Sequence, residues 1–151
     1  MTTGHSIDLL RQGLAELANA RKHLDYSHRQ VAEFSGTFAE ATEGQLESAD
    51  AFTGRFARAV DLLVNKVLRS LDRVEMNSEG TLLDVVNRAE KRGFVLEANT
   101  LREMKDVRNI IAHDYAGAKA AEIFAYCLEH KLIFDGICER VAVHAQRLIS
   151  E

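Results

Sequence analysis

In the stretch AFTGRFARAVDLLVNKVLRSLDRVE, residues 51–75, apolar residues recur every three or four positions. This spacing matches one face of an α-helix. Proline is absent from the chain, so nothing in it forbids long helices. The stretch therefore predicts one long amphipathic helix. Its inward-facing residues are Phe52, Phe56, Val60, Leu63, Val67, Leu71 and Val74.

The same apolar spacing marks further helices along the chain. We expect them over residues 6–34, over 79–92, from residue 99 or 100 onward, and over 118–150. The pattern of the last segment shifts phase around 129–131, which allows a break there. No stretch has the two-residue period of a strand. The sequence therefore predicts an all-α antiparallel bundle of five or six helices, in a single domain spanning residues 1–151.

Capping residues mark where several of these helices begin and end. Ser6 and Ser78 have side-chain acceptors that suit helix N-termini. Thr100 followed by Glu103 has the spacing of a capping box. Gly93 suits the left-handed position just beyond a helix C-terminus. These signals predict helix starts near residues 6, 79 and 100 and a helix end near 92.

Residues 35–51, SGTFAEATEGQLESADA, differ from the segments around them. They contain two glycines and several acids but no lysine or arginine. This composition favours a solvated connection with some frayed helix. A mobile acidic flap, or a segment that docks a partner, is the alternative.

The formal net charge of the chain is −4. A protein that coats nucleic acid non-specifically is expected to be basic, so this charge argues against that class but leaves a local basic pocket open. Cys127 and Cys138 form no Cys-x-x-Cys motif, and we expect free thiols in a reducing cytosol. The N-terminal residues lack a basic region with a long apolar run, and no apolar stretch approaches about 18 residues. We therefore expect a cytoplasmic protein without a signal peptide or membrane span.

The stretch VRNIIAHDY, residues 107–115, places a guanidinium, an imidazole and a phenol close together in sequence. At about 100° per residue, Arg108 and Tyr115 share nearly one helix face, whereas His113 lies about 140° from Arg108. Arg108 and His113 can meet if the helix ends near His113, or if two copies share one cleft across a two-fold axis. The alternative is structural: a surface ion pair, a helix-end histidine and a packing tyrosine.

The pattern Arg108-x-x-x-x-His113-x-Tyr115, in the C-terminal third of a short all-α chain, resembles the signature of the HEPN superfamily (higher eukaryotes and prokaryotes nucleotide-binding domains). It looks most like the HepT-type toxins, which are paired with a minimal nucleotidyltransferase antitoxin. The resemblance implies a homodimeric, metal-independent endoribonuclease without a cofactor. It implies a type VII-like toxin–antitoxin system in which Arg108 and His113 cleave mRNA or tRNA. Asn109 matches the polar residue usual after the arginine. Tyr115 matches the tyrosine to which the nucleotidyltransferase transfers AMP, which silences the nuclease.

Two groups of cations offer a basic surface for RNA. Arg102 and Lys105 precede Arg108 on one side of its helix, and we expect them to bind RNA. The interleaved Glu103 and Asp106 keep this patch modest. The second group lies on the first helix, where we expect it to face solvent rather than line a cleft. Its members are Arg21, Lys22, His23 and Arg29.

RNA cleavage needs the two side-chain types that the motif supplies. RNA carries its own nucleophile, the 2′-hydroxyl, so the protein must move protons and stabilise the charge of a phosphorane. An imidazole titrates near neutrality and can shuttle protons. A guanidinium matches two phosphate oxygens with its planar fork. The sequence does not separate an acid from a base role for His113. The six histidines show no i,i+4 pair and no zinc-finger spacing, so we expect no metal site.

Two other classes of protein fit parts of the pattern. A non-catalytic nucleotide- or substrate-binding subunit of a nucleotidyltransferase would use Arg108 and His113 to hold a nucleotide phosphate. The acidic balance of the chain favours this class slightly. In a pure interaction bundle, substituting Arg108 or His113 would change neither RNA cleavage nor nucleotide binding. RNA cleavage or nucleotide binding that depends on His113 distinguishes the three.

Overall fold

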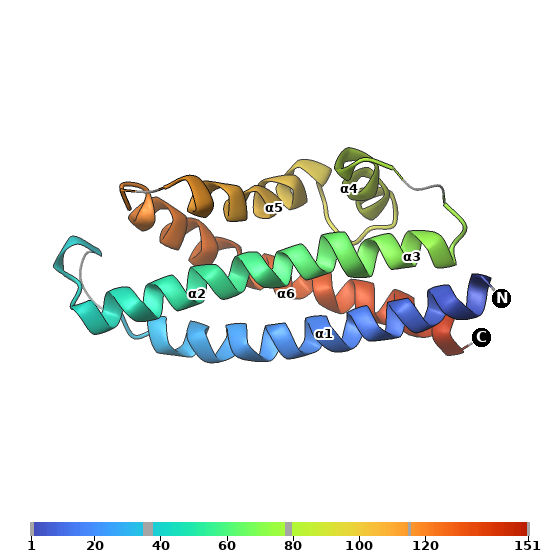
Figure 1. Cartoon of the computed structure of the whole chain (residues 1–151), viewed down its shortest axis with the longest axis horizontal. Helices are drawn as coiled ribbons and strands as arrows, with labels where there is room; N and C mark the ends of the chain where they lie inside the picture. Colours follow the sequence, from blue (N-terminus) through green and yellow to red (C-terminus); the bar gives the residue numbers. More distant parts are fainter. Residues whose placement is uncertain (1, 35–37, 78–79, 115, 151) are drawn as a thin grey trace.

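The computed structural model describes residues 2–34, 38–77, 80–114 and 116–150. Within these ranges the chain forms five helices and no strand, which confirms the predicted all-α class (Figure 1). A short 3-10 turn, η1 (Phe38–Glu40), precedes the second helix. The helices are α1 (Thr2–Val31), a long second helix built from α2 (Glu43–Asp61), the π-helical segment η2 (Leu62–Leu68) and α3 (Arg69–Val74), then α4 (Leu82–Lys91), α5 (Ala98–His113) and α6 (Ala120–Ser150). In Figure 1, α1, the α2–α3 helix, α5 and α6 alternate in direction, as an antiparallel arrangement requires.

The core lies between α1, the α2–α3 helix and α6, and α4 and α5 lie over the second helix. The predicted stripe of the second helix is buried from Phe52 to Leu71, and Val74 is half-buried. Gly13 allows α1 to approach closely, since a Cβ there would lie 3.3 Å from Cγ2 of Val67. None of the described helices combines the length and apolar character needed to cross a bilayer.

The second helix begins earlier than the sequence predicts, at Glu43 rather than at residue 51. Thr42 is its N-cap. The Thr42 hydroxyl accepts from the Gln45 N–H at 3.1 Å, and the Gln45 side chain accepts from the Thr42 N–H at 2.9 Å. This capping box satisfies two N–H groups at the helix start. The predicted solvated connection is therefore wrong for residues 43–51, where the chain is regular helix. The alternative, a mobile acidic flap or a partner-docking segment, stays a prediction, and residues 35–37 lie outside the described part.

Two other predicted helix starts are also wrong. α1 already begins at Thr2, and Ser6 is a buried residue inside it. The cap of α4 is Thr81, which makes a capping box with the third residue of the helix. Ser78 lies outside the described residues. The predicted end of α4 is confirmed, because Gly93 follows it with a φ of 80°.

The start of α5 is fixed by a contact from another helix. α5 begins at Ala98, so the predicted capping box of Thr100 and Glu103 is wrong. The N–H of Ala98 instead donates to the Glu90 carboxylate of α4 at 2.8 Å. A carboxylate at a helix N-terminus satisfies a free N–H and complements the helix dipole.

α6 is continuous through residues 129–131, where the sequence allowed a break. The apolar pattern shifts there because Lys131 takes a buried position, with 3% exposure. Its ammonium lies 2.7 Å from Asp25 of α1 and 2.6 Å from Asp135. Arg21 also pairs with Asp135, at 3.2 Å, so the prediction that Arg21 faces solvent is wrong.

Both cysteines are free, as predicted, and both are buried. Burial raises the pKa of Cys127 to about 12. The pKa of Cys138 also rises to about 12, chiefly through burial. The thiols of the folded chain are therefore protonated and act as small apolar groups in the core.

Candidate functional site

α5 has a buried face and an exposed face. Leu101, Met104 and Val107 are buried as predicted, and Ile111 is half-buried. This face fixes α5 against α2 and α4. The predicted site residues lie on the rest of its surface, exposed except for the half-buried Lys105. They are Arg102, Lys105, Arg108, Asn109 and His113.

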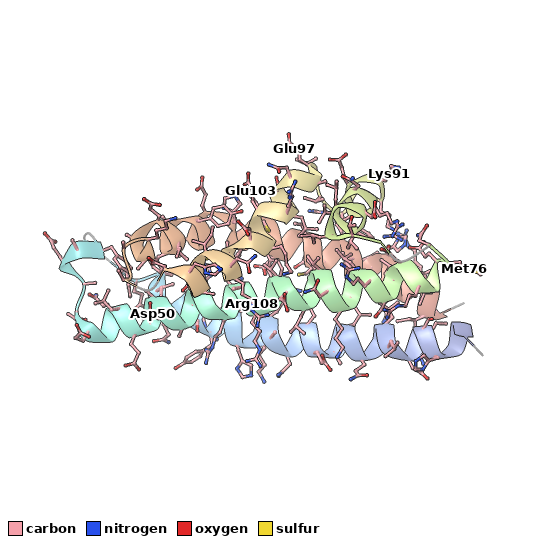
Figure 2. All side chains as sticks on the ribbon, turned by 45° about the horizontal axis from the view of Figure 1, so that its top comes forward. Asp50, Met76, Lys91, Glu97, Glu103 and Arg108 are labelled. Atoms are coloured by element: carbon pink, nitrogen blue, oxygen red, sulfur yellow. The ribbon has the colours of Figure 1, made fainter. Side chains whose placement is uncertain are left out.

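A carboxylate of α2 holds Arg108. Arg108 Nη1 donates to Asp61 Oδ2 at 3.0 Å, and Lys105 Nζ lies 3.0 Å from Asp61 Oδ1. Asn65 Nδ2 donates to the same Oδ1 at 2.9 Å. The Arg108 side chain remains 63% exposed, beside α2 in Figure 2. An exposed ion pair of this kind contributes at most about 1 kcal/mol. Asp61 therefore orients the guanidinium more than it stabilises the fold.

Asp61 stands at an unusual point of the second helix. It is the last residue of α2, and the π-helical segment η2 follows at once. π-helical turns are rare in proteins, and those that occur often lie at functional sites. The sequence interpretation missed Asp61. The signal that could have found it is a single carboxylate inside the apolar run AVDLLV, residues 59–64.

His113 ends α5, which confirms the predicted helix exit. Asp114 then turns the chain away, with its N–H donating to the Ile111 carbonyl at 3.3 Å. Asp114 Oδ2 accepts from the N–H of Lys119 at 3.0 Å and fixes the turn. His113, Asn109 and Lys119 line a surface cavity of about 300 Å³. The carboxylates of Asp106 and Asp114 and the side chain of Ile110 line the same space, so it is of mixed polar and apolar character.

A second cavity, of about 330 Å³, lies further toward the start of α5. Arg102, Lys105 and Asn109 line it together with acidic neighbours. Asn109 and Asp106 line both cavities, and Asn109 Nδ2 donates to Asp106 Oδ1 at 3.2 Å. Arg102 is the more accessible cation, because Lys105 pairs with Asp61 and is 18% exposed.

Arg108 is not among the residues that line the His113 cavity. It turns toward Asp61 of α2, whereas His113 lies on the side of α5 that faces Lys119. The divergence that the helical wheel predicts is present in the single chain. Tyr115 lies outside the described residues, so its predicted place beside the pair is left open.

In the described part of the chain, no group of three or more His, Cys, Asp or Glu side chains is placed to hold a metal ion. No protein-family model, curated protein or solved structure matches the chain. Its function is therefore inferred from the motif on α5 and from the geometry around it.

Proposed function

We propose that this protein is a metal-independent endoribonuclease of the HepT kind, a cytoplasmic toxin within the HEPN superfamily. One observation carries the proposal. The Arg-x4-His element ends α5 at His113, and the Asp61 carboxylate holds Arg108 while most of the Arg108 side chain stays exposed. An exposed arginine held by a carboxylate, five residues before a histidine at a helix exit, suits a polyanionic substrate.

In the proposed reaction, the 2′-oxygen of one ribose attacks the adjacent phosphorus, and the bond from phosphorus to the next 5′-oxygen breaks. A proton leaves the 2′-hydroxyl and a proton reaches the leaving 5′-oxygen. The products are a 2′,3′-cyclic phosphate and a 5′-hydroxyl. His113 carries protons, a role worth roughly 10²–10⁴ in rate. Arg108 stabilises the phosphorane oxygens, worth roughly 10²–10³ by analogy with an oxyanion donor.

A homodimer would complete this site. In one chain Arg108 turns to α2 and His113 faces a different cavity. A two-fold axis beside α5 would let Arg108 of one copy approach His113 of the other across one cleft. Asn109 would support His113 from the shared cavity wall. Arg102 and Lys105 would bind RNA phosphates beside it.

A partner nucleotidyltransferase would silence the enzyme at Tyr115. The Tyr115 oxygen would form a bond to the α-phosphorus of ATP, and pyrophosphate would leave. The attached AMP would add negative charge and bulk next to Arg108, and both oppose RNA entry. An ATP-dependent mass increase that disappears in Tyr115→Phe supports this regulation, and the same increase in Tyr115→Phe contradicts it.

The test of the ribonuclease is cleavage of single-stranded RNA in excess EDTA. Wild type should leave 2′,3′-cyclic phosphate ends, and Arg108→Ala and His113→Ala should each abolish cleavage. Circular dichroism should show unchanged helicity, because both side chains are exposed. Lys91→Ala, an exposed cation at the end of α4, is the matched control. Equal cleavage by wild type and both motif variants refutes the proposal.

The acids around the site favour one alternative, a nucleotide-binding subunit without catalysis. Asp106 lines both α5 cavities, and Asp61 neutralises part of the cationic patch. Such a protein would bind one nucleotide rather than a long polyanion. Calorimetry with ATP and with a short RNA distinguishes the two. ATP binding that needs Arg108, together with no RNA cleavage and no toxicity on expression, supports the subunit.

A further inference from the structure

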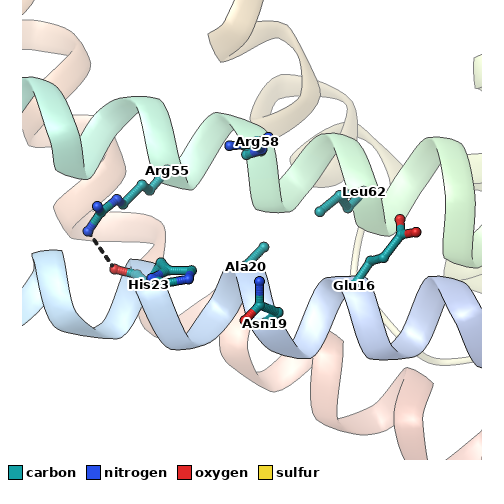
Figure 3. Close-up of a pocket in the computed structure, with 7 residues that line it drawn as sticks. All are labelled: Glu16, Asn19, Ala20, His23, Arg55, Arg58 and Leu62. Carbon is teal, nitrogen blue, oxygen red and sulfur yellow. Dashed lines mark hydrogen bonds between the residues drawn. The ribbon is translucent and has the colours of Figure 1, made fainter.

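A polar groove runs between α1 and α2, outside the candidate site (Figure 3). Its volume is about 490 Å³, larger than either α5 cavity. Both helices contribute polar side chains to its walls. The lining residues are Glu16, Asn19, Ala20 and His23 from α1, Arg55 and Arg58 from α2, and Leu62 at the start of η2.

The groove carries surplus positive charge on an acidic chain. Its one acid, Glu16, is paired with Lys66, whose Nζ lies 2.9 and 2.7 Å from the two carboxylate oxygens. Arg55 and Arg58 remain beyond that pair. A groove that concentrates two guanidiniums on a chain of net charge −4 is suited to an anion.

Arg55 is held in place across the groove. Its Nη1 donates to the His23 carbonyl at 3.2 Å, which Figure 3 shows, and to the Ser27 hydroxyl at 2.8 Å. Ser27 is buried, so this anchor is fixed to α1. A guanidinium has five N–H donors. Arg55 therefore keeps further donors for a ligand and has already lost much of its rotamer freedom.

The Arg58 side chain is exposed and makes no hydrogen bond or ion pair with the residues that the structure describes. Its natural partner would be Asp61, one turn further along α2. The Asp61 carboxylate is already bound by Lys105, Arg108 and Asn65. Arg58 is thus an accessible guanidinium between the groove and the residue that anchors Arg108.

We propose that the α1–α2 groove binds a phosphate of the RNA strand next to the scissile phosphate, through Arg58 and the anchored Arg55. This inference rests on the proposed function, because it takes Arg108 as the contact to the scissile phosphate. Arg58 and Asp61 are separated by about 4.5 Å of helix rise. A strand held at Arg108 therefore reaches Arg58 with a nearby phosphate, and the planar guanidinium fork fits two of its oxygens.

Binding is measured by fluorescence anisotropy of a labelled single-stranded RNA, with His113→Ala as the background so that the RNA stays intact. Adding Arg58→Ala should weaken binding about tenfold. It should also lower the slope of log affinity against log salt by about 0.7, as for one lost phosphate contact on a single strand. Arg147→Ala, an exposed arginine of α6, is the matched control and should change neither value. Equal affinity and slope for the two variants overturn the inference.

Substrate length gives a second test, with intact His113. A dinucleotide has one phosphodiester, so it can occupy Arg108 but offers no second phosphate to Arg58. Arg58→Ala should raise KM for a longer RNA about tenfold with kcat unchanged. It should leave kcat/KM for the dinucleotide unchanged. An equal loss on both substrates places Arg58 at the scissile phosphate and overturns the inference.

The remaining outcomes separate this inference from the ribonuclease itself. RNA binding that needs Arg58, in a protein that cuts no RNA, supports the groove and refutes the ribonuclease. ATP or inorganic phosphate is titrated alone. Arg58-dependent binding of either, without RNA binding, assigns the groove to a free ligand and overturns the inference. A changed oligomeric state in Arg58→Ala with unchanged RNA affinity makes the groove a subunit interface, which also overturns it.

Discussion

Replacing Asp61 by asparagine separates the orientation of Arg108 from its charge. The substitution keeps the side-chain volume and removes the carboxylate that lies 3.0 Å from both Lys105 and Arg108. We expect kcat for RNA cleavage to fall about ten- to a hundredfold, because misplacing a reacting group by about 1 Å costs up to about 10²-fold. RNA affinity should be unchanged or higher, because a negative charge that repels phosphate is lost.

The cost in stability can be worked out from the three contacts of Asp61. The pair with the exposed Arg108 contributes about 0.5 kcal/mol. The pair with Lys105, whose side chain is 18% exposed, contributes about 1 kcal/mol. The bond from Asn65 contributes about 0.5 kcal/mol, part of which an amide retains. A loss of about 1.5–2 kcal/mol lowers Tm by about 3–8 °C for a chain of this size.

The assay compares kcat at saturating RNA with Tm from circular dichroism. Asp50→Asn, the same chemical change at an exposed residue of α2, is the control and should leave both values unchanged (Figure 2). Asp61→Glu should recover part of the stability but little of kcat, because the longer side chain moves Arg108. If kcat of Asp61→Asn equals wild type while Tm falls, Asp61 is only a structural partner and the positioning role is refuted.

Asp72→Asn should lower the free energy of unfolding by about 3 kcal/mol, because this carboxylate is 4% exposed and accepts from two arginines at 2.7 and 3.1 Å. Urea denaturation measures the loss, and a value below about 1 kcal/mol, typical of exposed pairs, contradicts the reasoning. Thr42→Ala should cost about 1 kcal/mol through the lost cap of α2, whereas Thr42→Ser should cost little; equal melting of the two variants argues against the capping box. Because burial raises the pKa of Cys127 and Cys138 to about 12, iodoacetamide at pH 8 should label them only as fast as the chain unfolds. Rapid labelling of the folded chain would refute this protection of the thiols. Because the folded pKa values lie above the ordinary 9.0, the two thiols contribute stability that is full below pH 9.0 and is lost as pH rises toward 12.

The sequence predicted those features of the fold that depend on local periodicity. The stripe from Phe52 to Leu71 is buried, because a helix with that spacing has one face to bury. The divergence of His113 from Arg108 also follows from helical geometry alone, and the exit of α5 at His113 is one of the two arrangements that the sequence left open. Each of these depends on residues within a few turns of one helix.

Features that depend on contacts between helices could not be predicted from one sequence. The start of α5 is set by Glu90 of α4 rather than by its own Thr100. Lys131 interrupts the apolar pattern of its segment, and its partner Asp25 lies on another helix, 106 positions earlier in the sequence. Asp61 acts on Arg108 across 47 positions of sequence. In each case a charged side chain finds its partner only once the chain has folded.

In the proposed enzyme, Arg108 and His113 act together on RNA at a site shared by two copies. The most direct test mixes the inactive variants Arg108→Ala and His113→Ala under conditions that exchange subunits. A mixed dimer holds one intact arginine and one intact histidine on opposite copies. We predict that mixing restores cleavage in EDTA with 2′,3′-cyclic phosphate ends. No cleavage by the mixture, with mixed dimers demonstrated by mass spectrometry and wild type active, would contradict the shared site; an inactive wild type would contradict the ribonuclease.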